Sequence, residues 1–254
     1  MKVVLLCAGY ATRLRPLTDN QPKPLLPISG RPILEWILDK VAEVKAVDAV
    51  FIVSNHKFAG HFERWAGGST RPWPVHVVDD MTTTNENRLG AIGDLAFVLK
   101  KHGIGEEDLL VIAGDNFFDF DLNQFIQTSA KKRPHAAIAV YDVKDKTLAK
   151  QYGLVRTGAD GKVLEFFEKP ENPPTTLASC GLYWLPRQTR LLLDRYLSSG
   201  HNPDQPGHYM RWLAQTSSLF AVPLQGCWYD IGDLTSYEKA NKLFRDKQKS
   251  LRGN

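Results

Sequence analysis

The N-terminal stretch VVLLCAGYATRLRPLTDNQPKPLLP, residues 3–27, begins with an apolar run, Val3–Leu6. This run has the length and the β-branched content of a strand that is buried on both faces of a parallel sheet. The loop that follows consists mostly of small residues: Ala8, Gly9, Tyr10, Ala11 and Thr12. Because small residues let backbone N–H groups approach an anion closely, the stretch predicts a buried strand followed by an anion-binding turn.

Cationic side chains come directly after this turn. Arg13 and Arg15 belong to the turn, and Lys23 lies between Pro22 and Pro24, which restrict the backbone around it. A small-residue loop with fixed cations is suited to hold a triphosphate. The loop matches neither the G-x-G-x-x-G dinucleotide fingerprint nor the P-loop pattern, so from the loop alone a tight turn with surface cations remains an alternative.

The composition limits the classes of protein to consider. The chain has 254 residues, enough for one large domain or two small ones. Its net charge of +4 is compatible with small anionic substrates and is too diffuse to indicate nucleic-acid binding. No stretch approaches the roughly 20 apolar residues of a membrane span. We therefore expect neither a nucleic-acid partner nor a membrane partner.

The three cysteines indicate the compartment. Cys7, Cys180 and Cys227 are an odd number without C-x-x-C spacing, so a disulfide framework or a zinc site is not expected. The N-terminal apolar run is too short for the central region of a signal peptide. We therefore expect a cytoplasmic protein.

Strand and helix patterns alternate through the first half of the chain. Buried-strand patterns occur at 49–53, 75–78, 109–113 and 136–141, and helical periodicity occurs at 33–44, 58–65 and 89–99. This alternation favours right-handed βαβ units, with ligands at the carboxyl ends of the strands. The predicted fold class is α/β: a Rossmann-like, mixed and mainly parallel sheet flanked by helices.

The second half changes character. Shorter strand patterns at 152–155, 161–163, 167–170 and 178–185 suggest a small, partly antiparallel subregion. Helices are expected at 187–197, 209–213 and 234–249, with a polar, mobile loop at 198–207. No Pro/Gly/Ser-rich spacer separates the halves, so we expect one domain over residues 1–254.

Several polar residues have two interpretations each. Asp115 follows the end of a strand, where it is either a metal ligand or the cap of the next turn. The polar segment 82–88 is either a binding loop or a solvated connection that Gly90 ends. The pair Glu168-Lys169 is usually solvated, and Asp230 could be a turn acid. Asp119-Phe120-Asp121 has the D-x-D form of a metal motif, although a helix start fits it better.

The N-terminal stretch resembles the signature of the sugar-1-phosphate nucleotidyltransferases, approximately A-G-G-x-G-T-R-L-x-P-L-T, P-K-x-x-L-P and G-x-P. The matching segments are Cys7–Thr18, Pro22–Pro27 and Gly30–Pro32, with Ala8 and Ala11 where the family usually has glycine. Further matches follow in the correct order. They are Asn85 and Gly90 in Q-x-x-x-x-G-T-A, Gly114-Asp115-Asn116 in G-D-N, Phe166–Pro170 in F-x-E-K-P, and Trp228–Asp233 in W-x-D-[IV]-G-T.

The resemblance implies attack of a sugar-1-phosphate on the α-phosphorus of an NTP, which gives an NDP-sugar and pyrophosphate. Residues 1–130 would form the nucleotide-binding half and residues 131–254 the sugar-binding half. It also implies a role for each matching residue. The catalytic residues would be Arg13, Lys23 and Lys169, and the Mg²⁺ ligands would be Asp115 and Asp230. The nucleotide would be bound by Ala8, Gly9, Tyr10, Ala11, Thr12, Arg13, Asn85 and Gly90. The sugar phosphate would be bound by Lys23, Gly153, Glu168, Lys169 and Ser179.

Two other functions remain open. A catalytically silent regulatory subunit could bind a nucleotide-sugar, although such a protein should lose the metal carboxylates or the loop arginine. A glycosyltransferase on a similar sheet should use a D-x-D motif. A homo-oligomer would be usual for the family, but the sequence leaves the oligomeric state, the base and the sugar open. No hexapeptide repeats occur, so the β-helix domain of some relatives is not expected.

Overall fold

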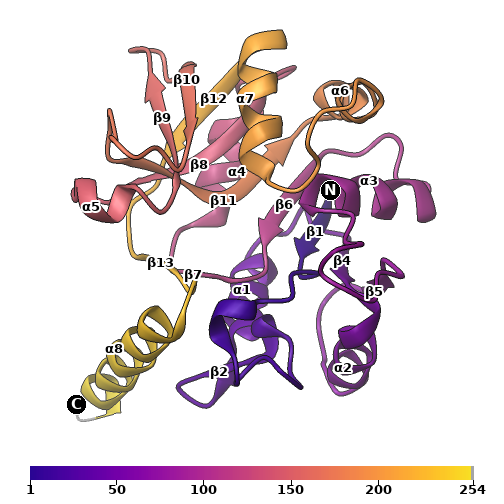
Figure 1. Cartoon of the computed structure of the whole chain (residues 1–254), viewed down its shortest axis with the longest axis vertical. Helices are drawn as coiled ribbons and strands as arrows, with labels where there is room; N and C mark the ends of the chain where they lie inside the picture. Colours follow the sequence, from indigo (N-terminus) through magenta and orange to yellow (C-terminus); the bar gives the residue numbers. More distant parts are fainter. Residues whose placement is uncertain (253–254) are drawn as a thin grey trace.

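The computed structural model describes the backbone of residues 1–252 and the side chains of residues 1–245. Within this part of the chain, one nine-stranded sheet forms the centre of the molecule (Figure 1). Its first half is parallel, with β6, β1, β4 and β5 as neighbours in that order. These strands are β1 (Lys2–Leu6), β4 (Ala49–Ser54), β5 (Val75–Asp79) and β6 (Leu109–Ala113). Parallel strands bring their carboxyl ends to one edge of the sheet, which positions a ligand crevice there.

The second half extends the same sheet with mixed strand directions. β11 (Leu177–Leu185) pairs antiparallel with β6 and with β8 (Ala136–Asp142). β12 (Leu219–Pro223), which the sequence analysis did not identify, pairs parallel with β8. β9 (Gly153–Thr157) and β10 (Val163–Glu168) form the antiparallel hairpin expected for the sugar-binding subregion. The predicted α/β fold class is confirmed.

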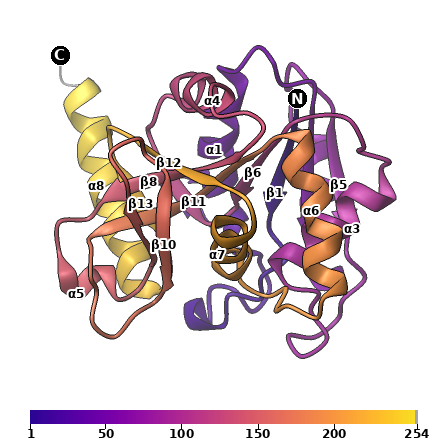
Figure 2. The same ribbon diagram turned by 90° about the horizontal axis from the view of Figure 1, so that it is seen from above.

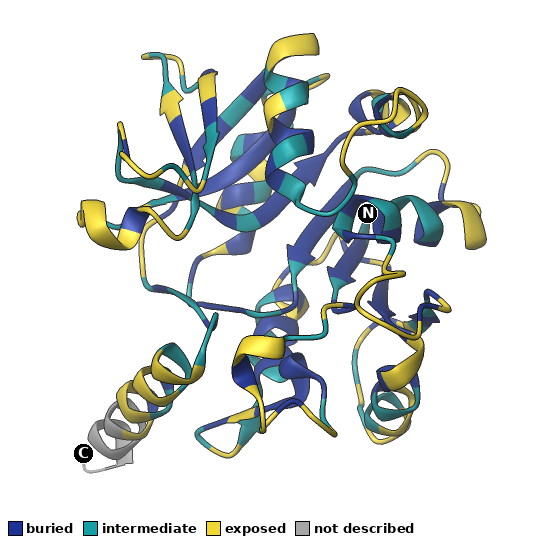
Figure 3. Cartoon of the chain, in the orientation of Figure 1, coloured by how far each residue is buried: buried dark blue, intermediate teal, exposed yellow. Residues whose placement is uncertain are grey.

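Helices cover both faces of the sheet because the strand side chains alternate between two hydrophobic cores. Val3 and Leu5 belong to one core and Val4 to the other, and all three are fully buried. Figure 3 shows the central strands as almost continuously buried. The first core receives α1 (Ile33–Ala42), α2 (His56–Gly67), α4 (Leu122–Ala130) and α8 (Leu234–Arg252). The second receives α3 (Ala91–Lys101), α6 (Arg187–Ser198) and α7 (Pro206–Thr216), on the opposite face (Figure 2).

Short elements complete the loops around the ligand edge. β7 (Asn116–Phe118) pairs antiparallel with β13 (Trp228–Asp230), so a late segment of the chain lies against the end of β6. β2 (Pro27–Ile28) pairs with β3 (Arg31–Pro32), and α5 (Lys146–Ala149) is a single helical turn. Two 3₁₀ turns, Thr12–Leu14 and Lys23–Leu25, hold the predicted anion-binding loop.

The loop between α6 and α7, residues 199–205, lies against the start of α3. The N–H groups of Ala91 and Ile92 donate to the carbonyls of Asp204 and Pro203, at 3.1 and 2.9 Å. The segment expected to be a polar, mobile loop is thus hydrogen-bonded to the start of α3. The helix expected at 234–249 is found as α8. The side chains of its last expected residues, including Lys247 and Lys249, lie outside the part of the chain whose side chains the structure describes.

Candidate active site

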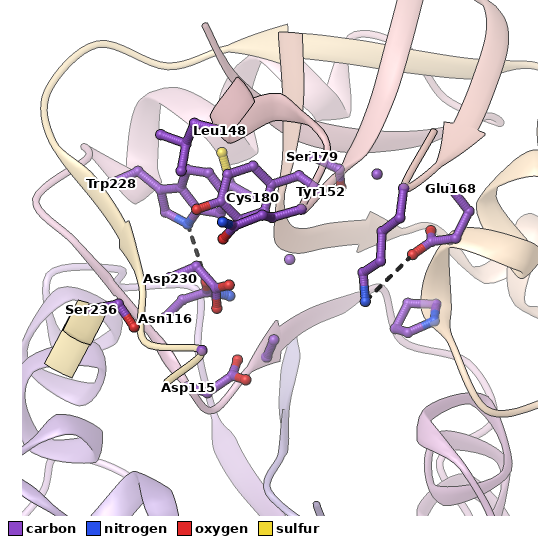
Figure 4. A pocket seen from close by; sticks show the side chains of 18 of the residues that line it. Asp115, Asn116, Leu148, Tyr152, Glu168, Ser179, Cys180, Trp228, Asp230 and Ser236 are labelled. Atoms are coloured by element: carbon purple, nitrogen blue, oxygen red, sulfur yellow. Dashed lines mark hydrogen bonds and ion pairs between the residues drawn. The ribbon is translucent and has the colours of Figure 1, made fainter. Parts of the chain in front are cut away.

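Asp115 and Asp230, the two predicted metal ligands, come together although they are far apart in the sequence. Asp115 follows the end of β6, and Asp230 is the last residue of β13. In the β7–β13 pair, Asp230 lies opposite Asn116, and the N–H of Ile231 donates to the carbonyl of Asp115 at 3.4 Å. Both carboxylates line one pocket of about 420 Å³ (Figure 4).

The electrostatics of this carboxylate pair favour a cation. The pKa of Asp230 is raised to about 6, because burial and the neighbouring Asp115 carboxylate, which raise it, outweigh Lys23, Arg13 and Lys169, which lower it. Lys23 is 8% exposed, and its Nζ lies 2.8 Å from Oδ2 of Asp115. A buried carboxylate beside a second one is costly unless positive charge compensates both.

The residues present fit a magnesium ion. Carboxylate oxygens are the hard ligands that Mg²⁺ prefers, and it usually takes only one or two from the protein, with water and substrate phosphates supplying the others. Among the described residues, no group of three or more Asp, Glu, His or Cys side chains could hold a metal ion. Asp115 and Asp230 are thus two carboxylates of the type that Mg²⁺ prefers.

The loop after β1 is strained at one position. Ala11 adopts the left-handed conformation, with φ of 45°, and its carbonyl accepts a hydrogen bond from Oγ1 of Thr18 at 2.9 Å. Asn55, which is fully buried, donates from Nδ2 to the carbonyl of Ala8 at 2.8 Å. Since glycine adopts this conformation more easily than alanine, the family's usual residue would relieve Ala11.

Arg13 lies where two pockets meet. It lines the larger pocket with the carboxylates and also a smaller pocket of about 150 Å³ with Gly9, Ala11 and Lys23. A Cβ built on Gly232 would lie 3.4 Å from Oδ2 of Asp230 and 3.8 Å from Nη2 of Arg13. The guanidinium therefore faces the same small space as the carboxylates.

Lys23, one of the five predicted sugar-phosphate residues, lines the smaller pocket, whereas the other four line the larger one. These four are Gly153, Glu168, Lys169 and Ser179. The Nζ of Lys169 lies 4.0 Å from Oε1 of Glu168, and Lys169 has φ of 44°. Burial raises the pKa of Glu168, and the charges of Lys169, His208 and Arg211 lower it. A Cβ on Gly153 would lie 2.7 Å from the ring of Phe166, so a larger residue there would displace that ring.

Asn85 and Gly90 line neither of these two pockets. Asn85 is exposed and borders a separate hollow of about 400 Å³ with Tyr10 and Thr12. Gly90 is buried with φ of +78°, and a Cβ there would lie 2.5 Å from the Cα of Asp204. Packing against the α6–α7 loop is therefore enough to explain the glycine, and its predicted contact with a nucleobase stays a prediction.

The structure adds pocket residues that the sequence analysis did not assign. Asn116 is 4% exposed, and its Oδ1 accepts from Nε1 of Trp228 at 3.1 Å. Tyr152 packs edge-on against Trp228, with ring centroids 4.8 Å apart. Gly181 has φ of +69°, and a Cβ there would lie 2.5 Å from Nδ2 of Asn116. The G-D-N match could have indicated Asn116, whereas Gly181 belongs to a strand pattern without such a signal.

The D-x-D segment has structural roles. Asp121 caps α4, because its Oδ1 accepts from the N–H groups of Asn123 and Gln124 at 2.9 and 3.2 Å. Asp119 accepts from the N–H of Cys227 and thereby holds the segment that leads into β13. The helix start favoured for this segment is confirmed for Asp121.

Comparison with known proteins adds independent evidence. Residues 2–247 match the family model described as nucleotidyl transferase. The chain is 28% identical over 251 residues to the bifunctional protein GlmU of Methanocaldococcus jannaschii, which covers 97% of this chain and 55% of GlmU. It is 27% identical over 267 residues to the glucose-1-phosphate adenylyltransferase of Clostridium novyi, covering 99% of this chain and 68% of that protein. The chain thus spans about half the length of GlmU.

A solved structure shares the fold. The structure of UDP-glucose pyrophosphorylase complexed with UDP-glucose superposes with a TM-score of 0.80 at 22% identity, covering 97% of this chain and 98% of that one. Because the family model covers nearly all of the sequence, the resemblance inferred from the motifs is confirmed: the chain belongs to the nucleotidyl transferase family.

Proposed function

We propose that this protein is a sugar-1-phosphate nucleotidyltransferase, which joins a sugar-1-phosphate to an NTP and releases pyrophosphate. The observation that carries the proposal is the convergence of Asp115 and Asp230 in a pocket that also holds Arg13 and Lys169. The activity named for the glucose-1-phosphate adenylyltransferase relative points in the same direction. Residues 1–130 would bind the nucleotide and residues 131–254 the sugar, within one domain.

The reaction needs charge neutralisation more than a covalent nucleophile. It brings two polyanions together for an in-line displacement, so positioning and electrostatic stabilisation supply most of the acceleration. Arg13 would neutralise the leaving pyrophosphate, and Lys23 and Lys169 would hold the α-phosphate and the attacking phosphate. Because a phosphate monoester is largely ionised near neutral pH, no general base is required.

The other predicted site residues are divided between the nucleotide, the sugar and the metal ion. The loop from Ala8 to Thr12 would hold the triphosphate through its backbone, with Asn85 and Gly90 near the base. Gly153, Glu168 and Ser179 would bind the hexose. When Mg²⁺ is bound by Asp115 and Asp230, it would supply charge stabilisation to the reacting phosphates.

The cellular setting is proposed from the same family chemistry. Among the described residues, no helix has the length and apolar character needed to cross a membrane. We expect a cytoplasmic enzyme, and a homo-oligomer would be usual for the family.

The test is to incubate the protein with each NTP, a panel of sugar-1-phosphates and Mg²⁺, and to measure pyrophosphate. Release with one pair, starting with glucose-1-phosphate and UTP or dTTP, would support the proposal. Binding of an NDP-sugar without turnover would instead indicate a regulatory subunit. Sugar transfer from an NDP-sugar would indicate a glycosyltransferase, which the capping role of Asp121 disfavours.

A further inference from the structure

Arg88 and Asp204 form an ion pair, here called the clasp, between two loops. One is the loop proposed to bind the nucleotide, and the other leads into the larger pocket. Nε and Nη2 of Arg88 donate to the two carboxylate oxygens of Asp204, at 2.7 and 2.9 Å. Arg88 belongs to the loop proposed to bind the nucleotide, and Asp204 belongs to the α6–α7 loop. This two-pronged geometry fixes orientation as well as distance, which a single ion pair does not.

The clasp continues into the nucleotide loop. Nη1 of Arg88 donates to the carbonyl of Asn85 at 2.6 Å. The backbone carbonyls of Pro203 and Asp204 accept from Ile92 and Ala91, the first residues of α3. Asp204 also packs on Gly90, where there is no room for a Cβ. The α6–α7 loop therefore contacts both ends of the segment from Arg88 to Ile92.

The same loop continues directly into the sugar pocket. Pro206 and Gly207, which follow it, line the larger pocket with Glu168 and Lys169. A Cβ on Gly207 would lie 1.8 Å from Oε2 of Glu168, so the backbone there is in close contact with that carboxylate. A ligand that shifts Glu168 or Lys169 would therefore press on the chain a few residues from Asp204.

We propose that the Arg88–Asp204 clasp couples the two substrate subsites, so that a sugar phosphate bound at Glu168 and Lys169 orders the nucleotide loop from Asn85 to Ile92. Arg88 and Asp204 are thus positioning residues, and this inference rests on the proposed function. Neither residue lines the larger pocket, so the coupling acts through the α6–α7 loop.

A purely structural role would have a different signature. The two side chains are 40% and 35% exposed, and exposed ion pairs usually contribute little to stability. Loss of the clasp should therefore change the melting temperature little. Its main effect should be on the apparent affinity for both substrates, since allosteric coupling commonly amounts to about 5–150-fold.

The first experiment uses hydrogen–deuterium exchange of the intact protein with a sugar phosphate alone. Glucose-1-phosphate, mannose-1-phosphate and N-acetylglucosamine-1-phosphate are tested in parallel. In the unmodified protein, the active compound should slow exchange at residues 166–169 and also at residues 89–93, which the ligand does not touch. In Arg88→Gln and Asp204→Asn, protection should remain at 166–169 and fall at least about fivefold at 89–93.

The second experiment measures KM and kcat for both substrates in a double-mutant cycle. Arg88→Gln and Asp204→Asn should each raise both KM values more than they lower kcat. The double variant should be little worse than either single variant, because both remove the same clasp. Arg187→Gln is the matched control, since it removes the exposed Arg187–Glu106 ion pair at the other end of α6 and should leave both KM values unchanged.

The outcomes separate this inference from the proposed function. Protection at 166–169 without protection at 89–93 in the unmodified protein would overturn the coupling and leave the sugar site in place. Additive effects in the cycle would also overturn it. If none of the sugar phosphates protects either region, the inference is overturned, whereas the proposed function is decided separately by pyrophosphate release.

Discussion

The ammonium group of Lys23 donates a hydrogen bond to Oδ2 of Asp115 at 2.8 Å, which links the N-terminal loop to the end of β6. Lys23 is buried, so its charged ammonium group has little contact with solvent. In the absence of substrates the cation thus compensates one member of the carboxylate pair. It lies close to where the reacting phosphates would have to bind beside Asp115.

Lys23→Ala should reduce turnover by orders of magnitude. A preorganised charge at such a site can contribute about 3–4 kcal/mol to transition-state stabilisation. The measurement is the rate of pyrophosphate release at saturating NTP and sugar-1-phosphate, with circular dichroism to verify the fold. Retained activity would show that Lys23 only compensates Asp115.

Asp115→Asn and Asp230→Asn should each abolish Mg²⁺-dependent pyrophosphate release, because an amide lacks the charge that binds a hard cation. Their fold should remain intact. Asp121→Ala is the control: it should cost about 1 kcal/mol of stability as a lost helix cap and should leave turnover unchanged. Near-normal turnover in either Asn variant would remove that residue from the metal site, and loss of activity in Asp121→Ala would revive the D-x-D interpretation.

Ala11→Gly and Ala8→Gly should have opposite effects on the free energy of unfolding: the first should stabilise the protein and the second should destabilise it. Ala11 has φ of 45°, so glycine there removes a left-handed strain of roughly 1–2 kcal/mol. Ala8 is not among the residues with positive φ, so Ala8→Gly should destabilise by about 0.4–1 kcal/mol through the entropy of the unfolded chain. Urea denaturation of both variants measures the difference. Equal destabilisation would contradict the strain at Ala11.

Gly90→Ala and Gly103→Ala separate backbone strain from packing. Both glycines have positive φ, +78° and +60°, but only Gly90 has the Asp204 backbone in the space of a Cβ. Gly103→Ala should cost about 1 kcal/mol, whereas Gly90→Ala should cost more and displace the α6–α7 loop. The readouts are urea denaturation and amide exchange at Ala91 and Ile92. A similar loss of stability in the two variants would show that the Asp204 backbone can move away from an added Cβ at little cost in free energy.

The protein should lose stability as the pH rises towards alkaline values, because of a buried carboxyl pair. Asp80 and Asp94 are 4% and 5% exposed, and burial, together with the nearby Asp80 and Asp204, raises the pKa of Asp94 to about 8. A folded-state pKa above the unfolded value means that the folded state binds the extra proton, so stability falls as the pH rises from the unfolded pKa through the folded one.

Asp94→Asn removes this titration. Between about pH 6 and about pH 9, the melting temperature of the unmodified protein should fall more than that of Asp94→Asn. Asp142→Asn is the control, because Thr176 and the Lys144 N–H lower the pKa of Asp142 and its titration affects only acidic pH. Parallel curves for Asp94→Asn and the unmodified protein would contradict the raised pKa.

The sequence predicted those parts of the molecule that short-range patterns specify. The apolar runs of β1, β4 and β6 correspond to the expected strands, and the start of α4 follows from the capping chemistry of Asp121. The observed helix ends differ from the predicted ones by a few residues. For example, α7 was expected at 209–213 and is found at Pro206–Thr216. Such ends depend on tertiary contacts that a local pattern does not contain.

Long-range pairing explains what was missed. β12 is a run of only five residues that becomes a strand by pairing with β8. The α6–α7 loop reads as a polar, Pro-bearing connection, but its order depends on Arg88 and on the first N–H groups of α3. The contact between Asp115 and Asp230 could be inferred only through family motifs, since no periodicity relates two such distant residues.

The pairing of β13 with β7 has a consequence for biosynthesis. Asp115, Arg13 and Lys23 leave the ribosome early, and Asp230 follows only after both halves of the central sheet have been made. A growing polypeptide can therefore form the loop after β1 long before the Asp230 carboxylate is available to join Asp115. If the two carboxylates act as proposed, nascent chains should release no pyrophosphate until β13 has been made.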